Sequence, residues 1–163
     1  MAASAYNKTT GQHPIWIEKG KIYCDEATVK YQLTQEHNYN ENDADGIIQQ
    51  INEHMKHGLP NFWWSAAAEM GTEAVRVLLH SIEHSQLIYL LSYQDAYGCT
   101  ALHWCADNEG NKVINVILGS VSEEECDQLL GIGEERGETP LHRSCIRGDT
   151  ESVRVMLNHI NQD

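Results

Sequence analysis

The tetrapeptide TPLH at residues 139–142 decides the fold, because it repeats the tetrapeptide TALH that stands 39 residues earlier, at 100–103. Each copy is preceded by an acidic residue and a glycine at the same two distances, which are Glu134 and Gly137 for the second copy. Glycine permits the positive φ of a tight turn, threonine is a good helix N-cap, and Pro140 suits the first position of a helix. Each copy therefore predicts a turn that leads into a helix.

A degenerate earlier copy precedes these two. In the same register Trp63 aligns with Leu102 and Gly71 aligns with Gly110, without any gap. In each copy we expect the first helix to end near a glycine and a second helix to follow, with apolar residues at helical spacing. These positions are Val75, Leu78 and Leu79 in the first copy, Val113, Val116 and Ile117 in the second, and Val153, Met156, Leu157 and Ile160 in the third.

The segment between the second helix and the next turn carries a signal of its own. Residues 122–125, SEEE, read as a capping box, in which a serine and a glutamate side chain each bind the other's backbone amide. Cys126, Leu129 and Leu130 follow, and Gly131 ends the pattern. We therefore predict an additional short helix between neighbouring copies.

The repeated unit resembles the ankyrin repeat, whose signature is T-P-L-H-x-A on a helix pair. TPLH matches its first four positions, and TALH lacks only the proline. The resemblance implies an all-α fold, an ankyrin-type α-solenoid of stacked helix pairs, with repeats at about 58–94, 95–133 and 134–163. It also implies that His103 and His142 bind backbone groups between neighbouring turns and do not act as general bases.

Before the repeats, residues 13–57 predict a divergent N-terminal cap. Four apolar residues between positions 47 and 55 fall on one face of a helix, as in the second helix of a degraded copy. Segments 14–18 and 21–24 predict a small hairpin or an extended arm, which either packs against the helices or is partly mobile. Residues 1–12 are predicted to be disordered.

Charge and cysteine content exclude several classes of function. The net charge of −13, from 24 acidic and 11 basic residues, disfavours a nucleic-acid partner. The acidic residues either keep the surface solvated or attract a basic partner. Five cysteines without a paired pattern predict free thiols in a reducing compartment, cytoplasmic or nuclear. No stretch reads as a signal peptide or as a segment inserted in a membrane.

The chain carries no signature of an enzyme, so we expect no catalytic residue, no cofactor and no bound metal. His80 and His84 stand four apart and could face one another as metal ligands, but no third ligand follows at a recognisable spacing, which favours an exposed helix face. Cys105 and Cys145 fall at packing positions, whereas Cys99 lies in a turn and is expected to be the accessible thiol.

The ankyrin resemblance implies a module for protein–protein interaction. We expect a non-catalytic adaptor or scaffold whose concave face binds another protein or a peptide segment, one that is basic if the acidic surface attracts it. Turn tips and the outward sides of first helices supply the contacts in such stacks. The expected protein-binding residues are Tyr97, Trp104, Asp107, Asn108, Arg136, Arg143, Ile146 and Arg147. Of Trp63 and Trp64, one is expected in the core.

Two other functions stay open. The chain can be a regulatory or assembly fragment of a larger multidomain protein. No polar helix pair follows the third copy, which predicts exposure of Val155 or Met156 and self-association through the C-terminal repeat. It can also bind a metal or a small ligand through its histidine-rich second helices, in which case purified, untagged protein retains zinc.

Overall fold

The computed structural model describes residues 13–160, so the disorder predicted for residues 1–12 lies outside the described residues. A pair of antiparallel helices occurs three times in succession, which confirms the all-α solenoid. The pairs are α4 (Leu59–Glu69) with α5 (Thr72–His80), α7 (Ala101–Asp107) with α8 (Asn111–Gly119), and α10 (Pro140–Arg147) with α11 (Thr150–Ile160).

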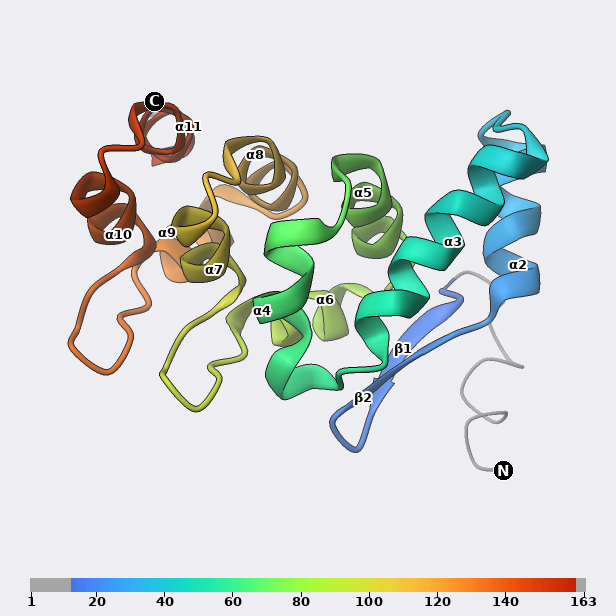
Figure 1. The fold of residues 1–163 in the computed structure, drawn as a ribbon, viewed down its shortest axis with the longest axis horizontal. Coiled ribbons are helices and arrows are strands. Elements are labelled where there is room, and N and C mark those ends of the chain that lie inside the picture. The colour runs from blue at the N-terminus through green and yellow to red at the C-terminus, as the bar shows by residue number, and fades with distance from the viewer. Residues whose placement is uncertain (1–12, 161–163) are drawn as a thin grey trace.

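The pairs stack in two layers (Figure 1). The first helices α4, α7 and α10 contact one another in order, and the second helices α5, α8 and α11 do the same. The turns before α7 and α10 project from the first-helix layer, and we call them the first finger (residues 93–100) and the second finger (131–139). The first helices and the fingers together form the surface on which partner-binding residues were expected.

Two further helices, α6 (His84–Ser92) and α9 (Glu123–Leu130), lie between the pairs. The predicted additional helix is α9, and its capping box is present. The Glu125 amide donates to Ser122 Oγ at 3.3 Å, and the Ser122 amide donates to the Glu125 carboxylate at 2.8 Å. These bonds satisfy two of the amides that the start of a helix leaves without a partner.

The N-terminal hairpin is present and packs against the helices. Strands β1 (Ile15–Glu18) and β2 (Lys21–Cys24) pair antiparallel, and Trp16 stacks on the opposite Tyr23 with ring centroids 5.5 Å apart. The Ile15 amide donates to the Ser81 carbonyl at 3.0 Å, which fastens the hairpin to the end of α5. Of the two alternatives for this segment, the packed one is therefore correct.

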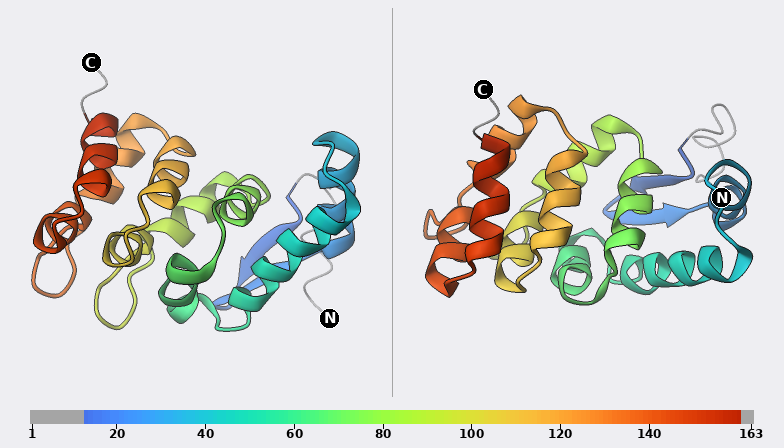
Figure 2. Two further views of the ribbon diagram at one scale, coloured as in Figure 1. Left: turned by 45° about the horizontal axis from the view of Figure 1, so that its top comes forward. Right: turned by 90° about the horizontal axis from the view of Figure 1, so that it is seen from above.

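The rest of the cap is helical (Figure 2). Helix α3 (Glu41–Met55) contacts α5 and so continues the second-helix layer, but it begins at residue 41, earlier than its apolar face suggests. Asn40 is the reason, because its side chain accepts the Asp43 amide at 2.9 Å. Helix α2 (Glu26–Tyr31) and the π-helical turn η1 (Gln32–Glu36) precede α3 and were not predicted from the sequence.

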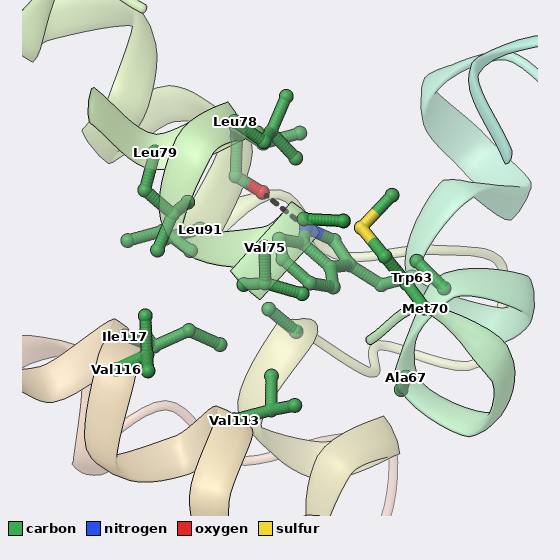
Figure 3. Packing of buried hydrophobic residues seen from close by; sticks show 14 of the residues in the cluster. Trp63, Ala67, Met70, Val75, Leu78, Leu79, Leu91, Val113, Val116 and Ile117 are labelled. Carbon is green, nitrogen blue, oxygen red and sulfur yellow. Dashed lines mark hydrogen bonds between the residues drawn. The ribbon is translucent and has the colours of Figure 1, made fainter. Parts of the chain in front are cut away.

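The core runs along the stack between the two layers (Figure 3). Trp63 is buried, and its indole N–H donates to the Leu90 carbonyl at 3.2 Å, while Trp64 is exposed. One tryptophan of this pair is thus in the core, as expected. Met156 is fully buried and Val155 is half-buried against the core, so the predicted exposure of one of these two residues is wrong. Helix α11 contacts α8, and Leu157 is the exposed apolar residue next to Met156.

Candidate functional site

An acidic side chain closes each finger. Asp95 Oδ1 accepts the amides of Tyr97 at 2.9 Å and Cys99 at 3.0 Å. Glu134, 39 residues later, accepts the two equivalent amides of the second finger at 2.8 and 3.2 Å. The acid in the repeated pattern therefore fixes the shape of the turn.

The two fingers are also joined to each other. Gly98 has a φ of +75°, and a Cβ at this position would lie 2.9 Å from the Glu135 nitrogen of the second finger. Only glycine therefore fits both the turn and the close approach. The Glu135 amide donates to the Tyr97 carbonyl at 3.3 Å, and Gln94 Nε2 bonds the carbonyls of Gly98 and Gly133.

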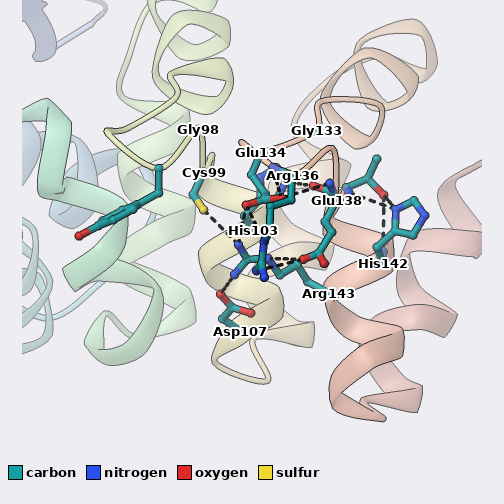
Figure 4. Close-up of polar contacts among 12 residues, drawn as sticks. Gly98, Cys99, His103, Asp107, Gly133, Glu134, Arg136, Glu138, His142 and Arg143 are labelled. Carbon is teal, nitrogen blue, oxygen red and sulfur yellow. Dashed lines mark hydrogen bonds and ion pairs between the residues drawn. The ribbon is translucent and has the colours of Figure 1, made fainter.

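His103 ties the second helix pair to the next finger (Figure 4). Its buried ring accepts the Thr100 amide on Nδ1 at 3.0 Å and donates from Nε2 to the Glu138 carbonyl at 2.9 Å. Burial lowers the pKa of this ring, although the bond to Glu138 opposes the shift. His142 accepts the Thr139 amide in the same local way at 3.1 Å, but its side chain is exposed and no bond to a further turn occurs among the described residues.

Arg143 lies in a cluster of three carboxylates (Figure 4). Its guanidinium is 2.5 Å from Asp107, 3.4 Å from Glu134 and 3.5 Å from Glu138. Burial alone would raise the pKa of Glu134, but the amides of Arg136 and Glu138 and the two guanidiniums lower it below its ordinary value. The charge of Arg143, only 17% exposed, is therefore balanced inside the protein.

Two adjoining hollows lie over α4 and α7, and both are lined by Trp64 and Trp104. We call them together the two-tryptophan groove. The hollow near the first finger has a volume of about 430 Å³ and is lined by His57, Asn61, Trp64, Asp95, Ala96, Tyr97 and Trp104. The other, of about 320 Å³, is lined by Trp64, Ser65, Ala68, Glu69, Trp104, Asp107 and Asn108.

A family model of the ankyrin repeat matches residues 136–163. This C-terminal segment of the chain is an ankyrin repeat. The matched segment holds the last helix pair, and the two pairs before it stack on it in the same two layers. No curated protein and no solved structure gave a match in the corresponding comparisons. Ankyrin repeats are typically non-catalytic interaction domains, and none of the described helices is long and apolar enough to cross a membrane.

The stack of helix pairs distributes the eight expected binding residues over several places. Tyr97, Trp104, Asp107 and Asn108 line the groove. The other four lie outside it: Arg143 in the carboxylate cluster, and Arg136, Ile146 and Arg147 exposed on the second finger and α10.

The groove residues that sequence reasoning missed include Trp64, Glu69 and Asp95. A signal for Trp64 was present, because two adjacent tryptophans on one helix cannot both face the core. Asp95 was recognised only as part of the repeated pattern. In the structure its Oδ2 also accepts the Trp104 indole N–H at 2.8 Å, which orients that ring in the groove.

The two spaced histidines do not form a metal pair in the ankyrin stack. His80 ends α5 and bonds the Arg76 carbonyl, whereas His84 begins α6 and bonds Glu125 at 2.8 Å. Among residues 13–160, no group of three His, Cys, Asp or Glu side chains could hold a metal ion. Both histidines are exposed, as expected, but they lie on two different helices and not on one helix face.

The thiols differ from their predicted exposure in two places. Cys99 is buried, with its sulfur 3.5 Å from a guanidinium nitrogen of Arg143, and burial raises its pKa to about 11. Cys145 is exposed, whereas the equivalent Ala106 is covered by the next helix pair. Cys105 is buried as expected, and its pKa is raised to about 12.

These environments predict that an aromatic disulfide reagent labels Cys145 first in the folded protein. Buried thiols with raised pKa values have little thiolate and no access to the reagent, so Cys99 and Cys105 should react only on unfolding. Timed labelling followed by peptide mapping checks this. The fast phase should vanish in Cys145→Ser, and its persistence would show that another thiol is open.

The buried histidine of the ankyrin motif predicts a pH dependence. The pKa of His103 in the folded protein is below its ordinary 6.5, so the neutral ring contributes fully to stability at any pH above its pKa in the unfolded chain. This contribution is lost as the pH falls through the pKa of the ring in the folded protein. We expect an NMR titration of the His103 ring to have its midpoint below 6.5. A midpoint at or above 6.5 would contradict the burial argument.

Proposed function

We propose that this chain is a non-catalytic adaptor or scaffold that binds another protein through the two-tryptophan groove and the two fingers. The observation that carries the proposal is the pair of adjoining hollows that share Trp64 and Trp104. Trp64 is 58% exposed and Tyr97 is 64% exposed, although both are large aromatic side chains. Tryptophan and tyrosine are enriched among the residues that carry most binding energy in interfaces.

The rigidity of the groove supports the same proposal. The fingers are closed by Asp95 and Glu134, and they are joined by the bond from the Glu135 amide to the Tyr97 carbonyl and by the Gln94 side chain. Trp104 is held by Asp95 through its indole N–H. A surface that is ordered before binding loses little conformational entropy when a partner docks, so a modest interface can suffice.

The acidic charge of the chain favours a partner that is basic. The net charge of −13 favours approach of a basic segment and disfavours nucleic acid. The cysteines are all free thiols, which agrees with a cytoplasmic or nuclear location as part of the same proposal.

A peptide library displayed on phage tests the proposed function. We expect the unmodified protein to enrich a common motif, and Trp64→Ala to lose it, because the hot-spot ring is gone. Tyr31→Ala is the matched control, since Tyr31 is also an exposed aromatic residue, 62% exposed, but lies in the N-terminal cap. Absence of any motif, or its retention by Trp64→Ala, would contradict the proposal.

A second candidate function is assembly through the C-terminal repeat. Leu157 and Ile160 on α11 and Ile146 on α10 are exposed apolar residues on neighbouring helices. Sedimentation equilibrium tests it: a mass that rises with concentration and returns to that of a monomer in Leu157→Lys supports assembly. A monomer mass at every concentration excludes it.

A further inference from the structure

We infer that the two-tryptophan groove binds an arginine or lysine side chain of the partner, held against the indole faces and beside Glu69 and Asp95. This inference rests on the proposed function and specifies the chemistry that the groove recognises. Three observations support it: the aromatic rings of the groove are stacked on no other ring of the described chain, two of its carboxylates have no basic partner there, and no lysine or arginine lines it.

The groove contains two exposed aromatic rings, Trp64 and Tyr97, and the half-buried ring of Trp104, which also packs against the core. The ring pairs within residues 13–160 are Trp16 with Tyr23, Phe62 with Trp63, and Tyr89 with Tyr93. Trp64, Tyr97 and Trp104 belong to none of these pairs. A cation within about 6 Å of the centre of such a ring is attracted by the electrons of its face, most strongly for tryptophan.

The carboxylates of the groove keep net negative charge. Asp95 accepts bonds from two backbone amides and the Trp104 indole, all neutral donors that fix its position without cancelling its charge. Glu69 is exposed in the second hollow and has neither an ion pair nor a hydrogen bond within the described part of the chain. Asp107 differs, because Arg143 neutralises it at 2.5 Å.

No cation of the chain itself occupies this place. The residues that line the two hollows include three carboxylates and one histidine, but no lysine or arginine. A basic side chain from a partner would therefore find aromatic faces and two carboxylates that no basic residue of the described chain neutralises. Arginine and lysine share this cationic chemistry, and arginine adds a planar group that stacks on indole and pairs with a carboxylate through two bonds.

A peptide of defined sequence tests the inference directly. The probe is Gly-Ser-Arg-Gly-Arg-Ser-Gly, and its analogue carries citrulline, which is uncharged and nearly the same shape, at both arginines. The readout is the indole N–H signal of each of the 4 tryptophans in a nitrogen-15 spectrum. We expect the signals of Trp64 and Trp104 to shift saturably with the probe and those of buried Trp16 and Trp63 to stay. The analogue should bind about fivefold more weakly. A lysine version separates the two basic residues.

Two variants distinguish specific binding in the groove from nonspecific attraction of the basic probe to the acidic protein. Glu69→Gln should weaken the probe about threefold, because it removes an unpaired carboxylate from the groove. Glu124→Gln removes the same charge from an exposed position on α9 and should leave the affinity unchanged. Equal binding of probe and analogue, equal losses in both variants, or unshifted Trp64 and Trp104 signals would overturn the inference.

The same spectra distinguish failure of the inference about a cationic side chain from failure of the proposed function. If motif peptides from the library shift Trp64 and Trp104 but tolerate neutral residues in place of every basic one, the groove binds proteins without the cationic contact, and only the inference fails. If motif peptides leave both signals unchanged, the binding surface lies elsewhere and the proposed function fails, while the defined probe still decides the inference.

Discussion

Replacing His103 with alanine should lower the free energy of unfolding by about 3 kcal/mol, whereas the same change at His142 should cost less than about 1 kcal/mol. The two histidines occupy the same position of the repeated motif and make the same local bond to a threonine amide. They differ in burial and in the bond that His103 makes to the Glu138 carbonyl of the next finger. The difference between the variants thus measures the connection between neighbouring repeats.

The larger loss at His103 has three sources. Truncation leaves the Thr100 amide and the Glu138 carbonyl without their partners, and it opens a cavity where the ring was fully buried. Urea unfolding of both variants measures the difference, provided that the slope with urea is unchanged. Equal losses would show that the ring acts only as a local cap and does not stabilise the connection between neighbouring repeats.

Arg143→Met should be the second most damaging substitution, with an expected loss of about 2 kcal/mol. Methionine fills a similar volume but leaves Asp107, Glu134 and Glu138 facing one another without the guanidinium that separates them. Arg136→Met is the matched control. Arg136 also contacts Glu134 and Glu138, at 3.8 and 3.5 Å, but its side chain is 72% exposed.

Exposed ion pairs contribute little, so Arg136→Met should change the free energy of unfolding by less than about 0.5 kcal/mol. Thermal or urea unfolding of the two variants gives the comparison. Added salt should reduce the difference in the free energy of unfolding between Arg143→Met and the unmodified protein only slightly, because buried charges are weakly screened. Equal effects of the two substitutions would mean that the cluster behaves as ordinary surface charge.

The repeat architecture could be predicted from the sequence because its signals are local. The turn glycines, the threonine caps and the SEEE capping box each act within a few residues, and the structure contains all of them. Helix α2 and the π-helical turn after it were missed because only Val29 and Leu33 are buried there, too few to show a period.

The groove and the thiols depend on contacts between distant segments, which a single sequence does not display. Trp64 meets Trp104 only because α4 and α7 lie side by side. Cys99 is buried beside Arg143 of the following repeat, and Cys145 is exposed because no described helix covers its side of α10. Equivalent positions in a repeat can therefore differ in exposure according to what stacks beside them.

Site-specific photocrosslinking tests the central claim, that a partner segment docks in the two-tryptophan groove, most directly. The photoreactive residue benzoylphenylalanine would replace Tyr97, which lines the groove, or Tyr31, which is equally exposed in the cap, in the presence of the strongest peptide from the library. The account predicts an adduct from position 97 that excess unlabelled peptide abolishes, and none from position 31. An adduct from position 31, with none from position 97, would contradict it.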